Sequence, residues 1–193
     1  MQAERDTLWQ PPADLIADAA LTRYARWLPE AGIGRFRTYQ DLWRWSVGDI
    51  ERFWTSIWEF FDVPGSRSPG PVLTSRSMPG ARWFEGSTLN YAEVALHGRH
   101  AVDAPAIECY REDGEMRSLS RGELTAAVGA AAEGLRRLGV GRGDRVAAYL
   151  PTVPEAVIGF LATASIGAVW SSCSPDFGPR AGAGPPRRPR PPR

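Results

Sequence analysis

Polar side chains follow the last apolar run of the chain, where a ligand could meet them. Ser174, Asp176 and Phe177 come directly after the strand-like run 168–173 and precede Gly178. In open α/β sheets, ligands bind at the carboxyl ends of the strands. We therefore take Ser174, Asp176 and Phe177 as candidate ligand-binding residues, and an ordinary surface loop is the alternative interpretation.

Two histidines form a weaker candidate, for a metal ion. His97 and His100 make an H-x-x-H pair beside Asp103, a spacing that joins both imidazoles if the segment is helical. Gly98 and the lack of a nearby third strong ligand instead indicate a solvated loop, so we expect no metal site. The chain has no further histidine and no G-x-S-x-G motif, so it does not predict a serine hydrolase.

Three glycines at alternate positions invite comparison with a dinucleotide site. Gly139, Gly141 and Gly143 form G-x-G-x-G, but they follow a predicted helix and precede a predicted strand. A dinucleotide pyrophosphate needs the reverse order, with the glycines leading into a helix N-terminus. These glycines therefore indicate a connecting turn.

The charged residues exclude several classes of function. All 23 basic residues are arginines, so no lysine is present to clamp a phosphate or form a Schiff base. With 22 acidic residues the formal net charge is +1, which gives no reason to expect a nucleic-acid partner.

Cysteine usage and hydropathy point to the cytoplasm. Cys109 and Cys173 lie far apart and form no CxxC motif, which favours two buried thiols in a reducing compartment. The N-terminus lacks the basic region and apolar run of a signal peptide. The uncharged stretch 156–175 is interrupted by Gly159 and Gly167, so we expect no membrane span.

The N-terminal half predicts helices with aromatic faces. Apolar spacing predicts a helix over 13–28 that Pro29 stops, and Thr38 with Asp41 predicts a capped helix start. Frequent Pro, Gly and Ser over 64–81 indicate an extended surface connector. A helix over 50–61 has an aromatic face that we interpret as core packing. Its opposite face is predicted to be polar and consists of Glu51, Arg52, Thr55, Ser56 and Glu59.

A hairpin and a long helix begin the C-terminal half. Asp113 and Gly114 between two short strand-like runs predict a β-hairpin in which both turn residues need positive φ. Ser120 and Glu123 predict a capping box, and Gly139 ends the helix. The predicted apolar stripe of this helix consists of Leu124, Val128, Ala131, Leu135 and Leu138.

A strand–helix–strand unit follows. The pattern predicts a buried strand over 145–150, a helix from Pro154 to about Ile166, and a strand over 168–173. Short connections of this kind make two parallel strands with a right-handed crossover. Parallel strands need cover on both faces, so the unit is expected to belong to a larger α/β sheet.

The tail over 182–193 contains only Gly, Ala, Pro and Arg, and we expect it to be disordered. Codons made wholly of G and C encode these same four residue types, so a reading-frame slip near residue 180 of a GC-rich gene is one explanation. The alternative is an interaction module, because the last five residues read P-x-x-P-R, which suits an SH3-like groove.

Three segments resemble the acetyl-CoA synthetase group of adenylate-forming acyl-CoA ligases. The N-terminal extension of that group is similar to FWTSIWEFFDV (Phe53–Val63) and MPGARWFEGSTLNYAE (Met78–Glu93). Its acetoacetyl-CoA synthetase branch is similar to GDRVAAYLPTVPEAVIGFLATASIGAVWSSCSPDFG (Gly143–Gly178). The resemblance covers about residues 7–180 and concerns the front of the family only.

The resemblance implies a two-step reaction that uses ATP, Mg²⁺ and CoA. A carboxylate attacks the ATP α-phosphate to give an acyl-adenylate, and the CoA thiol then displaces AMP. The family's lysine-bearing phosphate loop, ribose carboxylate, magnesium-binding Glu and C-terminal lysine do not occur in this chain, so no catalytic residue is carried over. In relatives the region of Ser174, Asp176 and Phe177 lies near the CoA channel.

The expected fold class is α/β. We expect an aromatic-rich helical extension over 1–95, the first hairpin and βαβ unit of an incomplete adenylate-forming domain over 96–178, and a disordered tail over 179–193. As an N-terminal part of an acetoacetate–CoA ligase, the chain is predicted to be inactive alone. An unpaired parallel sheet edge is also predicted to make it marginally stable.

Overall fold

The computed structural model describes residues 8–98 and 101–177, which form two compact units. Unit 1 extends to Val63 and also contains Arg67–Ser87, and unit 2 combines Pro64–Ser66 with the chain from Thr88 onward. Each unit has its own buried apolar cluster. The expected α/β class is confirmed, with helices concentrated in unit 1 and mixed helices and strands in unit 2.

Two helices replace the single helix predicted at the start of unit 1. α1 (Ala13–Asp18) and α2 (Ala20–Glu30) are separated at Ala19, whose ψ of 140° is extended. The break is stabilised because the Thr22 hydroxyl donates to the Ile16 carbonyl (2.6 Å), which no longer has its helical partner.

Pro29 does not stop α2, contrary to the prediction. It lies one residue before the helix end, so its missing N–H removes a single hydrogen bond in the last turn. The helix ends instead through Gly32, which has a φ of +70° and donates to the Pro29 carbonyl (3.2 Å), while the Ile33 N–H donates to Leu28 (3.0 Å). This is a glycine-type helix termination.

The next two helices begin where the sequence predicts, but Trp54 and Phe61 of the predicted aromatic face are exposed. α3 (Tyr39–Gly48) begins with the predicted capping box, in which Thr38 and Asp41 exchange side-chain and backbone hydrogen bonds. α4 (Ile50–Phe60) follows after Asp49, whose carboxylate accepts from the Arg52 N–H (3.3 Å).

The core of unit 1 is built mainly from aromatic rings. Tyr24, Leu28 and Leu42 are buried at its centre, and the Tyr24 and Phe60 rings meet edge to face at a centroid distance of 5.1 Å. The predicted polar face of α4 is wrong at one position, because Ser56 is 0% exposed. The buried Ser56 hydroxyl has two hydrogen-bond partners, the Tyr24 hydroxyl (2.5 Å) and the Phe53 carbonyl (2.7 Å).

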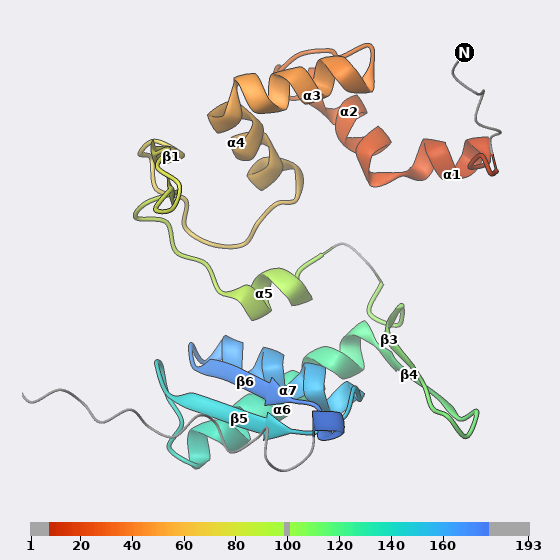
Figure 1. Ribbon diagram of the computed structural model, residues 1–193, viewed down its shortest axis with the longest axis vertical. Helices are drawn as coiled ribbons and strands as arrows, with labels where there is room; N and C mark the ends of the chain where they lie inside the picture. The colour runs from red at the N-terminus through yellow and green to blue at the C-terminus, as the bar shows by residue number, and fades with distance from the viewer. Residues whose placement is uncertain (1–7, 99–100, 178–193) are drawn as a thin grey trace, which may run out of the picture. The chain divides into compact units, whose positions relative to one another are not determined.

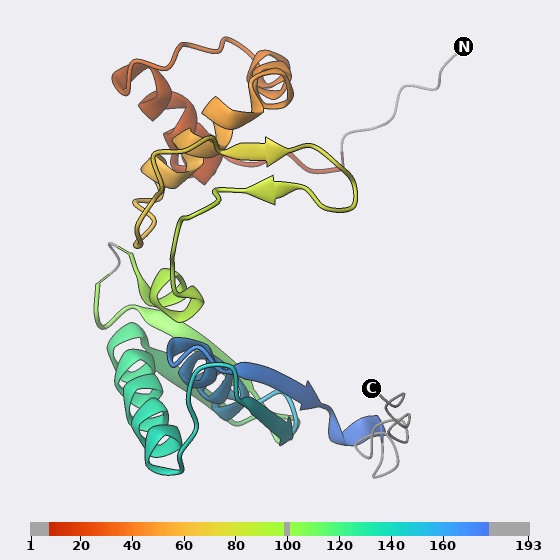
Figure 2. The same ribbon diagram turned by 90° about the vertical axis from the view of Figure 1, so that its left-hand side faces the viewer.

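A short antiparallel hairpin lies within and just beyond the predicted connector. Figure 2 shows β1 (Leu73–Ser75) and β2 (Arg82–Trp83) side by side, joined by a wide loop. The hairpin is attached to α4 at two points, because the Val72 N–H donates to the Glu51 carboxylate (3.0 Å) and the Phe84 ring packs on Trp58.

The first helix of unit 2 is α5 (Tyr91–Leu96), and its N-cap residue Asn90 connects it to a helix far along the chain. The Asn90 carboxamide oxygen accepts from the N–H groups of Ala92 (2.9 Å) and Glu93 (3.3 Å), as an N-cap does. The amide nitrogen of Asn90 donates to the carbonyls of Ala164 (3.3 Å) and Ser165 (3.0 Å) at the end of α7 (Pro154–Ser165).

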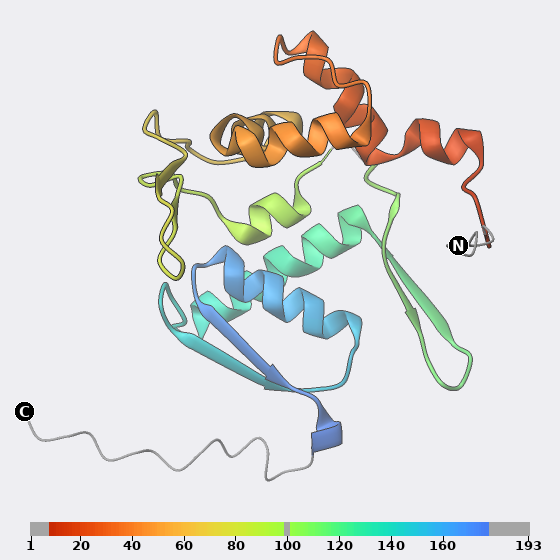
Figure 3. The same cartoon turned by 45° about the horizontal axis from the view of Figure 1, so that its top comes forward.

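The predicted hairpin is confirmed, with a different turn. β3 (Pro105–Tyr110) and β4 (Met116–Ser120) pair antiparallel, and Figure 3 shows them projecting as a long arm. Within Asp113-Gly114 only Gly114 has a positive φ (+84°), so the prediction of two positive values is wrong. The Gly114 N–H donates to the Arg111 carbonyl (3.0 Å), which makes a longer loop with one left-handed residue.

α6 (Arg121–Arg137) carries the predicted capping box of Ser120 and Glu123 and is followed by Gly139 at φ +83°. Its predicted stripe is wrong at the end, because Leu138 is the C-cap residue and is 81% exposed. The buried centre of unit 2 consists of Ala92, Leu124, Val128, Ala132, Leu161 and Ala162.

The predicted βαβ unit is confirmed. β5 (Arg145–Tyr149) and β6 (Val169–Cys173) are parallel, α7 connects them, and Figure 1 shows α7 and α6 stacked along this pair. β5 is not the buried strand that was predicted. Tyr149 and Val169 are each about half exposed, since the helices cover one face of the pair and leave the other accessible.

The structure also addresses the expected membrane and thiol properties. None of the described helices is long and apolar enough to cross a membrane. Cys109 and Cys173 are both free thiols, but they are half-buried and not buried as predicted.

Candidate functional site

The parallel pairing of β5 and β6 brings two chain segments to one edge of the sheet. Tyr149 lies opposite Cys173 at the end of the register, so the loops that begin at Leu150 and Ser174 leave the sheet side by side. The Leu150 N–H donates to the Cys173 carbonyl (3.3 Å) and extends the pairing to the start of both loops. The candidate residues therefore follow the carboxyl end of a strand, as predicted.

The three candidate residues lie together in one short turn. Pro175–Phe177 form a 3₁₀ turn, η1, that follows Ser174 directly. The Ser174 hydroxyl donates to the Asp176 carboxylate (2.7 Å), and the Asp176 N–H donates back to the Ser174 hydroxyl (3.4 Å). Ser174 is half-buried and Asp176 is exposed, so the carboxylate is presented to solvent. Gly178 lies outside the described residues.

Tyr149 was missed by the sequence reasoning, although it belongs to this site. Its hydroxyl donates to the Pro175 carbonyl (3.0 Å) and so connects the end of β5 to the turn after β6. The only available signal was a phenol at the last position of a predicted strand, and no spacing rule identifies its partner.

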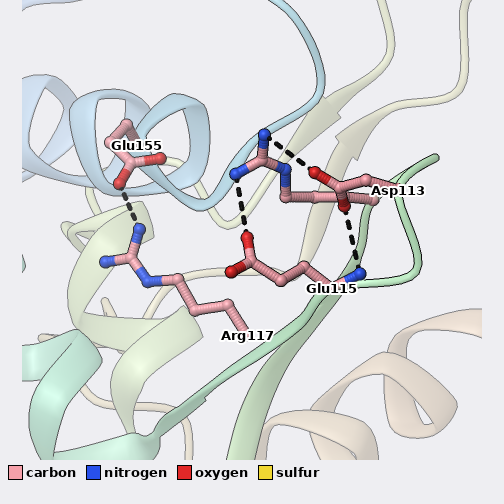
Figure 4. Close-up of polar contacts among 5 residues, drawn as sticks. Asp113, Glu115, Arg117 and Glu155 are labelled. Carbon is pink, nitrogen blue, oxygen red and sulfur yellow. Dashed lines mark hydrogen bonds and ion pairs between the residues drawn. The ribbon is translucent and has the colours of Figure 1, made fainter.

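The N-terminus of α7 lies in the loop that follows β5, and it is held by an ion pair. Arg117 of β4 contacts Glu155 in the first turn of α7 (2.6 Å), as Figure 4 shows. The hydrogen bond from Arg117 lowers the pKa of the Glu155 carboxyl below its ordinary value, so the group stays ionised. Both side chains are exposed, so the pair contributes little to the stability of the fold.

The weaker sequence candidates form no site in the described residues. His97 is the extended C-cap of α5, so the helix needed to join two imidazoles does not continue, and His100 lies outside the described residues. Gly139 and Gly143 have positive φ and connect α6 to β5, as predicted. Within residues 8–98 and 101–177, no three His, Cys, Asp or Glu side chains are grouped to hold a metal ion.

A small cavity of about 110 Å³ lies where α5, β3 and the start of α6 meet. Its polar side chains already bind the backbone: the Arg121 guanidinium donates to the carbonyls of Leu96 and His97 (3.3 Å each), and the Thr125 hydroxyl donates to Arg121 (2.8 Å). We therefore assign no ligand to it. The lining residues are Ala95, Leu96, Ala106, Arg121, Leu124 and Thr125.

Comparison with known proteins places these features in a family. Residues 39–95 match the family described as "Acetyl-coenzyme A synthetase N-terminus", and residues 94–183 match the family described as "AMP-binding enzyme". The chain is similar to the AMP-binding enzyme family over nearly half of its length. The resemblance that the sequence suggested is thus confirmed.

Members of this family resemble the chain along most of its length. Acetoacetyl-coenzyme A synthetase from Rhizobium meliloti (strain 1021) is 39% identical over 92% of this chain, and acetoacetyl-CoA synthetase from Rattus norvegicus is 38% identical over 91%. The structure of acetoacetyl-CoA synthetase from Streptomyces lividans matches 92% of the chain with a TM-score of 0.80 and 46% identity.

The match concerns only a part of each relative. The chain covers 27% of the Rhizobium meliloti protein, 26% of the Rattus norvegicus protein and 28% of the Streptomyces lividans structure. The described elements therefore correspond to about a quarter of these AMP-binding enzymes.

Proposed function

We propose that this chain forms the N-terminal part of an ATP-dependent acid–CoA ligase, which converts acetoacetate, ATP and CoA into acetoacetyl-CoA, AMP and diphosphate. The observation that carries the proposal is the match to the Streptomyces lividans acetoacetyl-CoA synthetase at 46% identity and a TM-score of 0.80. Agreement in both sequence and fold over 92% of the chain supports a shared reaction more strongly than a shared fold alone.

The names of the relatives support a short acid with a carbonyl group two carbons from the carboxylate carbon. Several relatives are acetoacetyl-CoA synthetases, and one that is 35% identical over 148 residues is a malonamoyl-CoA synthetase from Penicillium aethiopicum. Acetoacetate and malonamate have the same chain length and differ in a methyl against an amino group. Malonamate is therefore the natural competitor to test against acetoacetate.

The contribution of this chain is a scaffold for the reaction. ATP and Mg²⁺ would supply phosphate activation in a full-length member, but the chain contains no lysine, and its described residues contain no cluster of three His, Cys, Asp or Glu side chains that could hold a metal ion. The residues present do not fit a Mg·ATP site, and we derive no catalytic step from them. We therefore expect no turnover by this chain on its own.

The turn of Ser174, Asp176 and Phe177 is proposed to contact CoA. The exposed Asp176 carboxylate repels phosphate and accepts hydrogen bonds from N–H groups. The turn therefore suits a neutral, N–H-bearing part of CoA, such as its adenine amino group or pantetheine amides, and not its phosphates.

Domain limits and compartment complete the proposal. We place the end of the N-terminal extension near residue 95 and the end of the large-domain segment near 178, and the limits of the two matched families support the first of these. The compact units divide earlier, at Ser87 and Thr88, because α5 packs on α7. Two free, half-buried thiols support a reducing cytoplasm.

A chimera tests this function directly. Residues 8–177 would replace the matching segment of the Streptomyces lividans enzyme, and acetoacetate-dependent formation of AMP and acetoacetyl-CoA would be measured. We expect activity that prefers acetoacetate to malonamate and acetate. A folded chimera that activates none of these acids would overturn the proposal, and turnover by the isolated chain would overturn the scaffold role.

A further inference from the structure

The turn that carries Ser174 and Asp176 is held by a group on the neighbouring strand. The Tyr149 hydroxyl donates to the Pro175 carbonyl at 3.0 Å, across the end of the parallel pair. Tyr149 and Cys173 are register partners, so the phenol ring starts beside Cys173 and reaches two residues further along the chain. This contact joins the last residue of β5 to the turn that follows β6.

The other contacts of the turn are local or belong to the ladder. The Leu150 N–H fixes the Cys173 carbonyl, which lies before the turn, and the Ser174 hydroxyl fixes Asp176 within the turn. Neither contact determines where the turn as a whole lies relative to β5. Among the hydrogen bonds of the described residues, the one from Tyr149 to Pro175 joins the turn itself to β5.

We infer that Tyr149 is a positioning residue, whose hydroxyl holds the turn of Ser174 and Asp176 in the conformation that contacts CoA. The inference rests on the proposed function and extends it to a residue on β5. Tyr149 is 51% exposed, so its ring contributes little to a core, and its hydroxyl is the part with a defined partner. A fixed turn binds its ligand without first losing conformational entropy.

The test substitutes Tyr149→Phe, which removes the hydroxyl and keeps the ring. Tyr110→Phe is the matched control, because Tyr110 is also an exposed phenol at the end of a strand, and it has no described hydrogen bond. Hydrogen exchange measured by mass spectrometry on the whole chain reports the mobility of this turn through the amides of Ser174 and Asp176, because Pro175 has no N–H. In the acetoacetyl-CoA synthetase chimera, KM for CoA, KM for ATP and kcat are measured for the same substitutions. The change in KM for CoA is then compared with the changes in the other two.

Loss of one hydrogen bond corresponds to a factor of about two to ten in an equilibrium. We expect exchange at 174–176 to accelerate by about that factor in Tyr149→Phe, and KM for CoA to rise similarly, with KM for ATP and the unfolding midpoint unchanged. Tyr110→Phe is expected to change none of these quantities.

Two outcomes would overturn the inference, and they differ from failure of the proposed function. Exchange that is the same in Tyr149→Phe and Tyr110→Phe would show that the hydroxyl does not hold the turn. Faster exchange with an unchanged KM for CoA would show that the turn does not contact CoA. An inactive wild-type chimera would instead reject the proposed function, while the exchange measurement still decides whether Tyr149 holds the turn.

Discussion

Two hydroxyl groups share one buried hydrogen bond in the core of unit 1, and their roles are unequal. The Ser56 hydroxyl has one proton, which it donates to the Phe53 carbonyl, so the Tyr24 hydroxyl is the donor in the bond between the two side chains. Burial raises the pKa of the Tyr24 phenol, which keeps it protonated and able to donate. Without Ser56 the Tyr24 hydroxyl has no acceptor, whereas without the Tyr24 hydroxyl Ser56 still donates to the Phe53 carbonyl.

This asymmetry predicts the order of two substitutions. Tyr24→Phe leaves Ser56 with its carbonyl partner and is expected to cost about 1 kcal/mol in free energy of unfolding. Ser56→Ala leaves a buried phenol without an acceptor and is expected to cost about 2 to 3 kcal/mol. Urea unfolding followed by tryptophan fluorescence measures both. Combining the substitutions should recover part of the larger loss, and strict additivity would show that the two hydroxyls are not coupled. A larger loss for Tyr24→Phe than for Ser56→Ala would contradict the assigned bond direction.

The Asn90 side chain caps α5 through its oxygen and donates to the end of α7 through its nitrogen. Substitutions at this position are therefore predicted to differ in stability, and the difference should depend on pH. Asn90→Ser and Asn90→Asp both keep a capping oxygen for Ala92 and lose the donors to Ala164 and Ser165. Asp also places a negative charge at the C-terminus of α7, where the helix dipole is unfavourable.

We expect Asn90→Asp to be less stable than Asn90→Ser by about 1 kcal/mol at pH 7. The difference should shrink at low pH as the new carboxyl is protonated. Chemical unfolding followed by circular dichroism at both pH values checks this. Equal stability of the two variants at pH 7 would show that the side chain at position 90 does not place its charge against the C-terminus of α7.

At the scale of elements, the contact of α7 with β6 depends on a missing side chain. A Cβ at Gly159 would lie 3.0 Å from the Trp170 ring, whereas a Cβ at Gly129 on α6 would meet nothing within 4 Å. Gly159→Ala is therefore expected to destabilise by about 1 to 3 kcal/mol through overpacking. Gly129→Ala is expected to stabilise by up to about 1 kcal/mol through helix propensity. Thermal unfolding of both variants is the measurement, and a stabilising Gly159→Ala would show that Trp170 moves aside freely.

The start of α6 predicts sensitivity to acid. The Ser120 N–H, followed by the Ser120 side chain, lowers the pKa of Glu123 below its ordinary value of 4.5. A lowered folded-state pKa gives stability that is present above the unfolded-state value and is lost as the pH falls through the folded-state value. Glu123→Gln keeps an acceptor for the capping box without this titration. We expect the urea midpoint to fall less between pH 6 and pH 3 in Glu123→Gln than in the wild type, and identical falls would exclude this role for Glu123.

Local signals predicted most elements of this chain, and long-range contacts account for the errors. Capping boxes at Thr38 and Ser120 act within four residues, so both helix starts were correct. Ser56 was wrongly placed on a polar face because its burial depends on Tyr24, 32 positions away. The candidate turn was found from strand order, but Tyr149 was not, since its bond to Pro175 spans 26 positions.

At the scale of the whole molecule, the two units have separate cores and separate optical signals. Trp170 belongs to unit 2, and the other seven of the eight tryptophans belong to unit 1. Tryptophan fluorescence therefore reports mainly on unit 1, and circular dichroism reports on both units.

We expect the two signals to give different unfolding midpoints, because neither buried cluster contains residues of the other unit. Ser56→Ala should shift the fluorescence transition, which reports unit 1. Gly159→Ala should shift the part of the dichroism transition that does not coincide with the fluorescence transition. Coincident transitions that shift together in both variants would show that the units unfold as one. One face of the β5–β6 pair is half exposed, so we still expect unit 2 to be marginally stable.

The two hydrogen bonds from Asn90 to the end of α7 also determine when this part of the chain can be completed during translation. They join residues 74 and 75 positions apart, so α5 is synthesised long before its partner. The helices of unit 1 are close neighbours in the chain and can associate while the ribosome is still translating unit 2. The nascent α5, in contrast, must wait until Ser165 has left the ribosome, and until then Ala92 lacks the α7 surface that buries it.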